Sequence, residues 1–183
     1  SEVYGTRALG TLEELLAIKE IDAVIVATPI GCHQEDGTRA LLAGKHLWCE
    51  KSLASGITDT RNLLDKAAAS DLAVNVVCSP LYHPLFGMLL KRTGQLDIGA
   101  VLSIDAQFGF PHVSEDHPKY DPQLDGSALS DVGYYPIVIG TSLLRDEINL
   151  VSAVMETEPG FDIDTRGSAF FRSSHGAHII MRW

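Results

Sequence analysis

Two side chains able to take part in proton chemistry stand together at the end of an apolar run. Residues 45–49 have the composition of a buried strand, and Glu50 and Lys51 follow directly. A lysine held at the end of a buried strand can be desolvated and can hydrogen-bond a substrate oxygen. Glu50 can hold that ammonium group or face a cofactor. The spacing alone favours a solvated surface pair, because most neighbouring Glu and Lys residues form no more than that.

A second pair, Asp131 and Tyr135, is four residues apart in a stretch with helical character. Residues at this spacing share one face of a helix, so a carboxylate and a phenol can address one ligand together. A tyrosine near a lysine can give or take the proton of a carbonyl–alcohol interconversion. The alternative is a Tyr135 that packs in the core with its hydroxyl hydrogen-bonded. Pro136 lacks a backbone N–H and should kink or open the helix here.

Three further candidates follow another apolar run, residues 21–27. Thr28 and Pro29 end this run, and His33 comes after the turn. Ligands of open parallel sheets bind beyond the carboxyl ends of the strands, so all three residues are expected on the ligand side of the sheet.

Metal and hydrolase chemistry have little support in the sequence. His112, Asp116 and His117 could supply metal ligands, but their spacing matches no standard set, and no metal is expected. The sequence contains no GxSxG and no HExxH motif, so nothing supports a serine hydrolase or a metalloprotease.

The elements that must position the first candidates alternate between helix and strand. Thr11 and Glu14 form a capping box that predicts a helix in residues 12–20. Further helices are predicted near 33–43 and 58–70, and strands at 21–27, 45–49 and 72–77, the first two buried on both faces. This order predicts an α/β fold with a doubly wound parallel sheet, a partial Rossmann domain over residues 1–79.

The pattern changes after Pro80. Helices are predicted near 82–92 and 127–144, with a polar loop at 111–125. Residues 100–108 alternate apolar and polar side chains, which is typical of an antiparallel strand with one exposed face. Strand-like runs follow near 150–155, 168–172 and 177–183. Residues 80–183 are therefore predicted to be an α+β domain with a mostly antiparallel open sheet.

Composition narrows the class of protein. The 183 residues carry 14 Lys and Arg against 24 Asp and Glu, and this net charge of −10 argues against nucleic-acid binding. No apolar run approaches the ~18–20 residues that a membrane-spanning helix needs, so no membrane association is expected. Cys32, Cys49 and Cys78 are an odd number in apolar surroundings, which suits reduced thiols in a cytoplasmic protein.

Several motifs in the right order resemble the Gfo/Idh/MocA family of oxidoreductases, which includes relatives of glucose-fructose oxidoreductase and inositol dehydrogenase. The matching segments are ATPxxxH at residues 27–33, AGKHxxCEK at 43–51 and GxALxDxGxY at 126–135. Ser52 stands where the family has proline after Glu-Lys, which predicts a looser turn beside Lys51. The family's glycine-rich first segment is not in this chain. Both ends are therefore interpreted as truncated, and weak dinucleotide binding by this chain alone is expected.

The resemblance implies roles for the candidate residues. Lys51 would be the catalytic lysine, Tyr135 the acid/base group and Asp131 its polar partner. The residues beside a bound NAD or NADP would be Thr28, Pro29, His33, Glu50 and Lys51. The substrate would be a sugar, a sugar nucleotide or a cyclitol, and the C-terminal sheet would form a homodimer or homotetramer. The alternative is an inactive relative that binds a dinucleotide or a sugar and acts in regulation.

Overall fold

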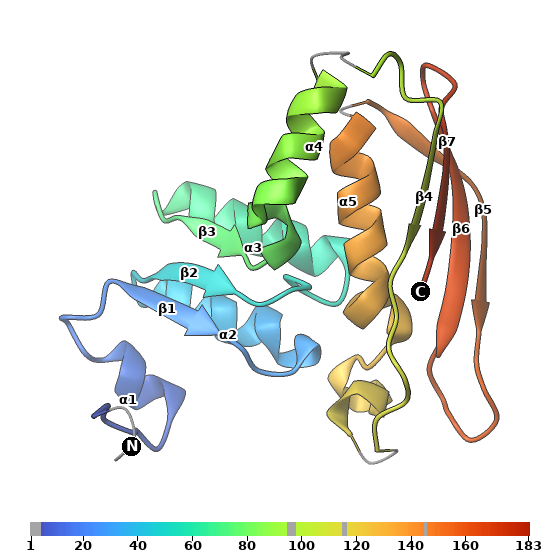
Figure 1. Ribbon diagram of the computed structural model, residues 1–183. Helices are drawn as coiled ribbons and strands as arrows, with labels where there is room; N and C mark the ends of the chain where they lie inside the picture. The colour runs from blue at the N-terminus through green and yellow to red at the C-terminus, as the bar shows by residue number, and fades with distance from the viewer. Residues whose placement is uncertain (1–4, 95–97, 115–116, 145) are drawn as a thin grey trace. The chain divides into compact units, whose positions relative to one another are not determined.

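The structure is a computed structural model that describes residues 5–94, 98–114, 117–144 and 146–183. The chain divides into two compact units, residues 1–77 and 78–183, each built on its own sheet (Figure 1). The predicted α/β fold class is confirmed. None of the helices in the described part combines the length and apolar character needed to cross a bilayer.

The first unit contains the six elements predicted for it, but its strands are shorter and its first helix ends at Leu16 rather than at residue 20. They are α1 (Leu12–Leu16), β1 (Ala23–Val26), α2 (Ile30–Leu42), β2 (His46–Cys49), α3 (Ile57–Ala69) and β3 (Val74–Val76). Thr11 caps α1 by accepting a hydrogen bond from the Glu14 backbone N–H at 3.2 Å. Gly44 follows α2 with a φ of +74°, a conformation that glycine adopts without the usual steric penalty.

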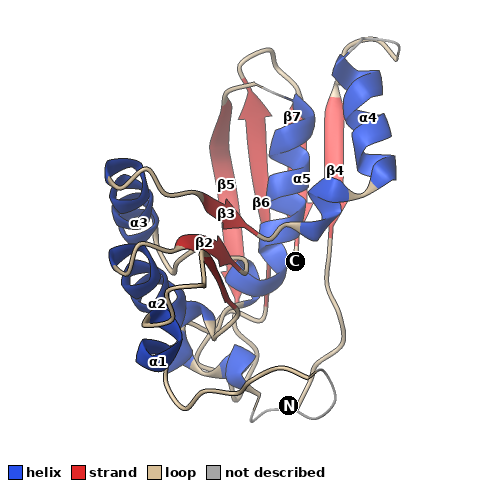
Figure 2. Ribbon diagram, turned by 90° about the vertical axis from the view of Figure 1, so that its left-hand side faces the viewer, coloured by secondary structure: helices blue, strands red, loops and turns tan. Residues whose placement is uncertain are grey.

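The three strands are parallel in the order β1-β2-β3, and the helices that the structure describes in this unit lie on one face of the sheet (Figure 2). The prediction that β1 and β2 are buried on both faces is wrong, because exposed and buried residues alternate along both strands. Both crossovers proceed in the same direction along the sheet, so α2 and α3 lie on the same side. Ile25 is 68% exposed and Trp48 is 47% exposed on the other face.

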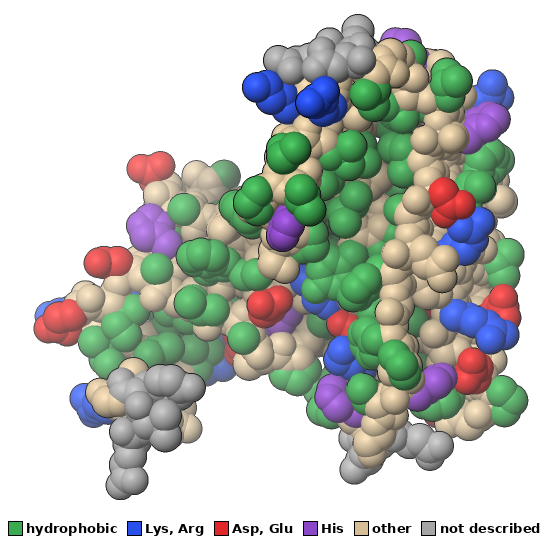
Figure 3. Space-filling view, viewed as in Figure 1, with side chains coloured by type: hydrophobic (Ala, Val, Ile, Leu, Met, Phe, Trp, Pro, Cys, Tyr) green, Lys and Arg blue, Asp and Glu red, His purple; other side chains and the backbone are tan. Residues whose placement is uncertain are grey.

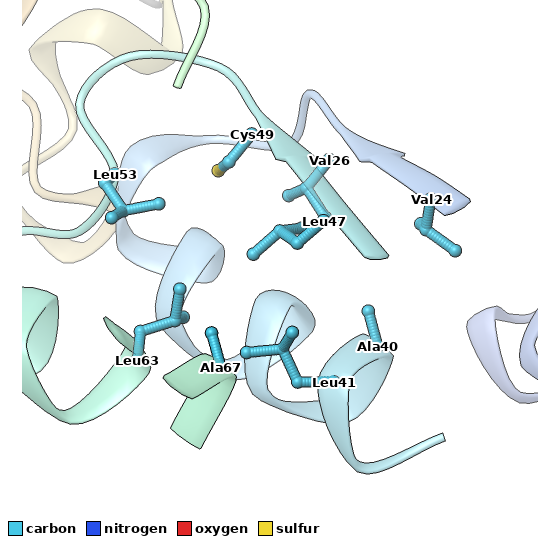
Figure 4. Close-up of a cluster of buried hydrophobic side chains, with 9 residues drawn as sticks. All are labelled: Val24, Val26, Ala40, Leu41, Leu47, Cys49, Leu53, Leu63 and Ala67. Carbon is cyan, nitrogen blue, oxygen red and sulfur yellow. The ribbon is translucent and has the colours of Figure 1, made fainter. Parts of the chain in front are cut away.

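The core of the first unit lies between the sheet and α2 and α3 (Figure 4). Gly37 lets α2 approach the sheet closely, because a Cβ atom there would lie 2.9 Å from side-chain carbons of both Leu47 and Leu63. The buried cluster consists of Val24, Val26, Ala40, Leu41, Leu47, Cys49, Leu53, Leu63 and Ala67. This packing fixes the carboxyl ends of the strands, where the candidate residues follow.

The second unit has helices before and between its strands. Its longer elements are α4 (Pro84–Gly94), β4 (Ser103–Gln107), α5 (Tyr134–Leu144), β5 (Ile148–Glu156), β6 (Arg166–Ser173) and β7 (His178–Arg182). Short helical turns are η1 (Ser79–Tyr82), η2 (Pro118–Tyr120), η3 (Pro122–Leu124) and the π-helical segment η4 (Leu129–Gly133). The irregular η4 segment confirms that the helix opens close to Pro136.

The sheet of the second unit has the order β4-β7-β6-β5. Its β5–β6 and β6–β7 pairs are antiparallel, but β4 pairs with β7 in parallel, so the antiparallel prediction for residues 100–108 is wrong. A long connection through α5 and two further strands separates β4 from β7, which permits the parallel direction. Helix α5 packs on the face that carries the fully buried Ile179 and Met181, with α4 beside it (Figure 1).

Candidate functional site

In the first unit, candidate residues follow two neighbouring strands at the same edge of the sheet. The last pair of the β1–β2 ladder is Val26 with Cys49, so Thr28 and Glu50 both lie just beyond it. The Glu50 backbone N–H extends the ladder by donating to the Val26 oxygen at 2.9 Å. The Thr28 hydroxyl donates to Asp36 Oδ2 at 2.9 Å. This edge is the place where open parallel sheets bind their ligands.

Glu50 and Lys51 are half-buried rather than fully solvated. The Lys51 backbone N–H donates to Glu50 Oε2 at 3.3 Å, which turns the carboxylate back towards its own loop. The peptide bond between Lys51 and Ser52 is cis.

His33 does not present a free polar atom to a ligand. It is 1% exposed, in the first turn of α2. Its Nε2 lies 2.7 Å from the backbone oxygen of Thr28, and its Nδ1 lies 2.7 Å from the backbone oxygen of Ser52. The ring therefore lies between the loop after β1 and the loop after β2, within hydrogen-bond distance of both.

Cys49, directly before Glu50, is fully buried. Burial raises the pKa of its thiol from 9.0 to about 12, and the negative charges of Glu50 and Asp36 add to this effect. The thiolate, which is the reactive form, is therefore disfavoured, and Cys49 is best described as a core residue.

In the second unit, Asp131 lies in η4 and Tyr135 in the first turn of α5. Asp131 Oδ2 forms a 2.7 Å salt bridge with Lys119 Nζ, and this ammonium group lies 4.3 Å from the centre of the Phe110 ring. The Tyr135 ring meets Phe108 edge to face, with 4.9 Å between centroids. Aromatic packing therefore orients both the phenol and the cation beside the carboxylate.

The start of η4 is held by Asp164, a buried residue from the loop before β6. Its Oδ1 accepts a hydrogen bond from the Ser127 hydroxyl, and its Oδ2 accepts from the Leu129 N–H at 2.8 Å and the Trp183 Nε1–H at 3.2 Å. A carboxylate that satisfies backbone donors at the beginning of a helix stabilises that beginning. Asp164 thereby fixes the segment that carries Asp131.

A cavity of about 210 Å³ lies beside Asp131 in the second unit. Lys119 and Arg166 contribute cations to its wall, and Tyr120 and Trp183 contribute aromatic rings. Arg166 also pairs with Glu156 and Glu158, so the charges in this region are nearly balanced. A cavity with a few converging polar groups and aromatic walls suits a small, uncharged, hydroxylated ligand.

A wider groove of about 630 Å³ runs between α4, α5 and β4, and Tyr135 lines it. Its other walls are largely apolar, with Leu89, Phe108, Ile139 and Leu143 among them. Figure 3 shows hydrophobic side chains gathered over α4 and between α4 and β4. Tyr135 therefore borders a surface hollow rather than being enclosed in the core.

Tyr134, the neighbour of Tyr135, has a different environment. Burial raises the pKa of its phenol from 10.0 to about 12, and interactions with Cys78 and Tyr135 raise it further. A phenol held in its protonated form is poorly suited to exchange protons near neutral pH.

The possible metal set, His112, Asp116 and His117, falls only in part on described residues. Among the described residues, no group of three or more His, Cys, Asp or Glu side chains is placed to bind a metal ion. Asp116 lies outside the described residues.

Thr28, Pro29, His33, Glu50 and Lys51 are thus gathered at one edge of the first sheet, and Asp131 and Tyr135 at one end of α5 in the second unit. Two residues that contribute to this second group, Lys119 and Asp164, were not predicted. Lys119 lies in a polar loop without a motif, and nothing near Asp164 in the sequence indicates that it caps a segment more than thirty residues earlier.

Comparison with known proteins gives matches over both units. A family model described as "Oxidoreductase family, NAD-binding Rossmann fold" matches residues 1–77, and a "GFO/IDH/MocA C-terminal domain" model matches residues 91–183. A dTDP-3,4-didehydro-2,6-dideoxy-alpha-D-glucose 3-reductase of Streptomyces violaceoruber is 32% identical over 92% of this chain and 49% of its own length. The chain spans about half the length of the curated relatives it matches.

Two further relatives show the range of similar proteins. A D-xylose 1-dehydrogenase (NADP(+)) of Haloferax volcanii is 29% identical over 93% of this chain and 52% of its own length. A 3-ketoreductase from Actinomadura kijaniata, solved with NADP and TDP-benzene, has a TM-score of 0.93 and 28% identity over 99% of this chain and 56% of its own. Solved variants of this reductase carry a Tyr-to-Phe or a Lys-to-Glu replacement.

Proposed function

The chain belongs to the Gfo/Idh/MocA family of oxidoreductases, and we propose that the protein is an enzyme that transfers a hydride between NAD or NADP and a hydroxyl or carbonyl group of a sugar, a sugar nucleotide or a cyclitol. The observation that carries this proposal is the joint presence of Lys51, Asp131 and Tyr135 in the positions that the family's motifs give to its reacting groups. Each of them lies where its unit can present it to a ligand: at the edge of a parallel sheet or beside a cavity.

The spacing of Lys51 and Tyr135 supports these roles. The number of residues between them equals the number between the lysine and the tyrosine replaced in the variants of the Actinomadura kijaniata reductase. Replacing a tyrosine by phenylalanine removes only a hydroxyl group, a change suited to testing a proton donor. The equal spacing supports the assignment of Lys51 and Tyr135 as the corresponding pair.

The residues at the edge of the first sheet fit a nicotinamide dinucleotide. Glu50 offers a carboxylate that can accept hydrogen bonds from ribose hydroxyls, and Lys51 offers a cation. Thr28 and Pro29 are exposed directly before α2, whose first turn has no side-chain cap. When bound, the dinucleotide supplies or accepts the hydride at its nicotinamide ring.

The chain's own residues manage the proton and the orientation of the substrate. In the oxidation direction, the proposed role of Tyr135 is to take the proton from the substrate hydroxyl. The proposed role of Lys51 is to hydrogen-bond a substrate oxygen through its ammonium group and to stabilise developing negative charge. In the reduction direction Tyr135 returns the proton. Asp131, held by Lys119, accepts hydrogen bonds from substrate hydroxyls in the neighbouring cavity.

The test compares the complete protein with a Lys51→Met variant. Turnover with NAD and NADP is measured on a panel of sugars, sugar nucleotides and cyclitols. We expect Lys51→Met to lower kcat by about 100- to 10,000-fold, the usual range for a group that stabilises proton transfer. Lys66→Met, at an exposed lysine of α3, serves as the matched control and should retain full activity. Unchanged turnover in Lys51→Met would remove Lys51 from the mechanism.

The second candidate function is a regulatory relative that binds a dinucleotide or a sugar without turnover. The apolar lining of the groove beside Tyr135 is consistent with binding of a ligand, but it does not by itself indicate turnover. Saturable quenching of tryptophan fluorescence by NADH or NADPH, together with no turnover on any substrate of the panel, would support this function over the enzyme.

A homodimer or homotetramer is proposed through the sheet face opposite α5. Phe170 and Ile180 are paired across β6 and β7 on this face, and Val154 on β5 is 56% exposed. Sedimentation velocity should show an oligomer that Val154→Glu weakens. Leu42→Glu, at an exposed apolar residue of the first unit, is the control and should leave the oligomer intact.

A cytoplasmic location is proposed from the cysteines. Cys32, Cys49 and Cys78 are all free thiols, and the last two are buried, which suits a reducing compartment. Fractionation of the native cells with an antibody tests this location.

A further inference from the structure

His33 occupies an unusual position in the first unit. It is almost completely buried, and each of its ring nitrogens lies 2.7 Å from a backbone oxygen of a different loop. One oxygen belongs to Thr28, in the loop after β1, and the other to Ser52, in the loop after β2. Carbonyl oxygens only accept, so a neutral ring donates to one of these oxygens and only an imidazolium ring donates to both. In either form both nitrogens face the chain itself, and the ring is too buried to hydrogen-bond a dinucleotide.

We propose that His33 is a positioning residue for Lys51 and acts through its buried ring, which packs between the backbone oxygens of the two loops and donates a hydrogen bond to at least one of them. This inference rests on the proposed catalytic role of Lys51. The resemblance assigned His33 a direct contact with the dinucleotide, whereas the geometry gives it an indirect part through Thr28 and Ser52.

The backbone on both sides of Lys51 is anchored to neighbouring parts of the unit. On one side, the Glu50 N–H donates to the Val26 oxygen and ends the β1–β2 ladder. On the other side, the Ser52 oxygen lies against the His33 ring. These two anchored peptide groups bracket Lys51, each one peptide unit away from its flanking groups, and they limit how far its Cα atom can move. This restraint matters, because a displacement of about 1 Å at a reacting group can cost about 100-fold in rate.

The same ring couples the lysine loop to the cofactor side of the sheet edge. Thr28 directly precedes the exposed Pro29 and α2, and its backbone oxygen lies against His33 Nε2. A change at His33 would therefore shift the Lys51 loop relative to the residues proposed to line the dinucleotide. The expected signature is a loss of turnover that exceeds any loss of binding.

The test is a His33→Gln variant of the complete protein. We expect kcat to fall by about 10- to 100-fold, while the KM values for substrate and dinucleotide change by less than about 3-fold. If His33 contacted the dinucleotide directly, the KM for the dinucleotide would rise more than kcat falls, and that result would overturn the inference. An unchanged kcat would overturn it as well.

Leu41→Ala is the matched control for a merely structural effect. Leu41 is 3% exposed on the same helix, near the end that lies away from the loops. The variant should lose stability, as buried Leu-to-Ala changes do, and keep its kcat at a temperature where it is folded. A fall in kcat equal to that of His33→Gln at equal folded fraction would show that the effect is general destabilisation, and would contradict a positioning role.

A second measurement applies if His33→Gln does not fold. In the unaltered protein labelled with ¹⁵N, an N–H of the His33 ring should give a persistent, slowly exchanging NMR signal, because it is buried and hydrogen-bonded. A ring proton that exchanges at the solvent rate would overturn the inference. The Lys51→Met variant separates the two proposals: an active Lys51→Met refutes the role of Lys51, whereas an inactive one beside a fully active His33→Gln refutes only the role of His33.

Discussion

The contacts that hold the proposed catalytic residues in place join residues at different sequence separations in the two units. In the first unit, Lys51 follows a strand and is flanked by anchors from the neighbouring β1 and α2, and His33 is 19 residues away from Ser52. In the second unit, Asp131 and Tyr135 depend on Asp164, which is 35 and 37 residues away from Leu129 and Ser127. A sheet edge therefore follows from local strand patterns, whereas the irregular helix start requires a partner from a distant loop.

Because these contacts differ, we expect substitutions in the two units to have different structural consequences. Disturbing the first unit should displace one residue from a rigid edge, and disturbing the second should loosen a whole helical segment. Each of the following substitutions is to be made and measured in the complete protein.

The largest expected effect belongs to Tyr135→Phe. The variant keeps the ring that packs against Phe108 and removes only the hydroxyl. We expect kcat to fall by about 100- to 10,000-fold in protein that is still folded, because a proton donor is lost and the ring packing is kept. Steady-state kinetics measure kcat, and thermal unfolding checks that the variant is folded. The neighbouring Tyr134→Phe is the control, and an equal loss of kcat in both variants would contradict the assignment.

The second effect concerns the distant support. Asp164→Ala removes the acceptor of three donors, the Ser127 hydroxyl, the Leu129 N–H and the Trp183 indole. Since each buried donor without a partner costs about 1–3 kcal/mol, we expect the free energy of unfolding to fall by roughly 3 kcal/mol, with a lower kcat at temperatures where the protein is still folded. Urea unfolding measures the change. Asp162→Ala, at an exposed residue in the same loop, should have little effect on either quantity.

Comparable losses of stability in Asp164→Ala and Asp162→Ala would contradict the proposed dependence of η4 on a residue distant in sequence. The start of η4 would then be maintained by its own sequence, and the second unit would be as locally determined as the first.

The third prediction concerns the pH range in which each unit begins to lose stability. The unfolded thiol of Cys49 ionises near pH 9.0, but the folded one has a pKa of about 12. Between these values the unfolded chain releases a proton that the folded chain keeps, so stability is lost as pH rises, by up to about 1.4 kcal/mol per pH unit. Tyr134 adds the same kind of loss in the second unit, but only from about pH 10, since its pKa rises from 10.0 to about 12.

Cys49→Ala tests this difference directly. The variant should flatten the loss of stability between pH 9 and 10, as measured by urea unfolding at a series of pH values. Tyr134→Phe should leave this interval unchanged and flatten the curve only above pH 10. An identical pH dependence in the unaltered protein and in Cys49→Ala would show that the buried thiol does not control the alkaline stability of the first unit.

The sequence predicts the place of the first group at the sheet edge because Thr28, Pro29, Glu50 and Lys51 come within three residues of a strand end. His33 lies in the first turn of the helix that follows β1. The apolar run before Glu50 fixes both the strand and the point where it ends, and the parallel register then places Thr28 at the same edge. The burial of only one face could not be predicted from the apolar runs, because it depends on the direction of both crossovers. Ile25 and Trp48 are as apolar as their buried neighbours.

The second group illustrates what a sequence pattern omits. The spacing of Asp131 and Tyr135 predicts a shared helix face, but it contains no information about Asp164 or Lys119. The hydrogen bonds of Asp164 and the salt bridge of Lys119 arise only when loops distant in sequence meet. The parallel pairing of β4 with β7 has the same origin, since its partner is the last strand of the chain.

The smallest expected effect concerns Lys119, the cation that the second unit places beside Asp131. The salt bridge is partly exposed, with side chains 36% and 18% accessible, so its loss should cost about 1 kcal/mol or less in stability. If Lys119 only orients Asp131 towards substrate hydroxyls, Lys119→Met should raise the substrate KM by about 3- to 10-fold and leave kcat within about 2-fold.

Lys91→Met, at an exposed lysine of α4, is the matched control for this variant and should change neither constant. A collapse of kcat in Lys119→Met, on the scale expected for Lys51→Met, would mean that Lys119 takes part in the proton chemistry itself. The second unit would then supply its own cation to the reacting oxygen, and the division of roles between a lysine of the first unit and a tyrosine of the second would have to be abandoned.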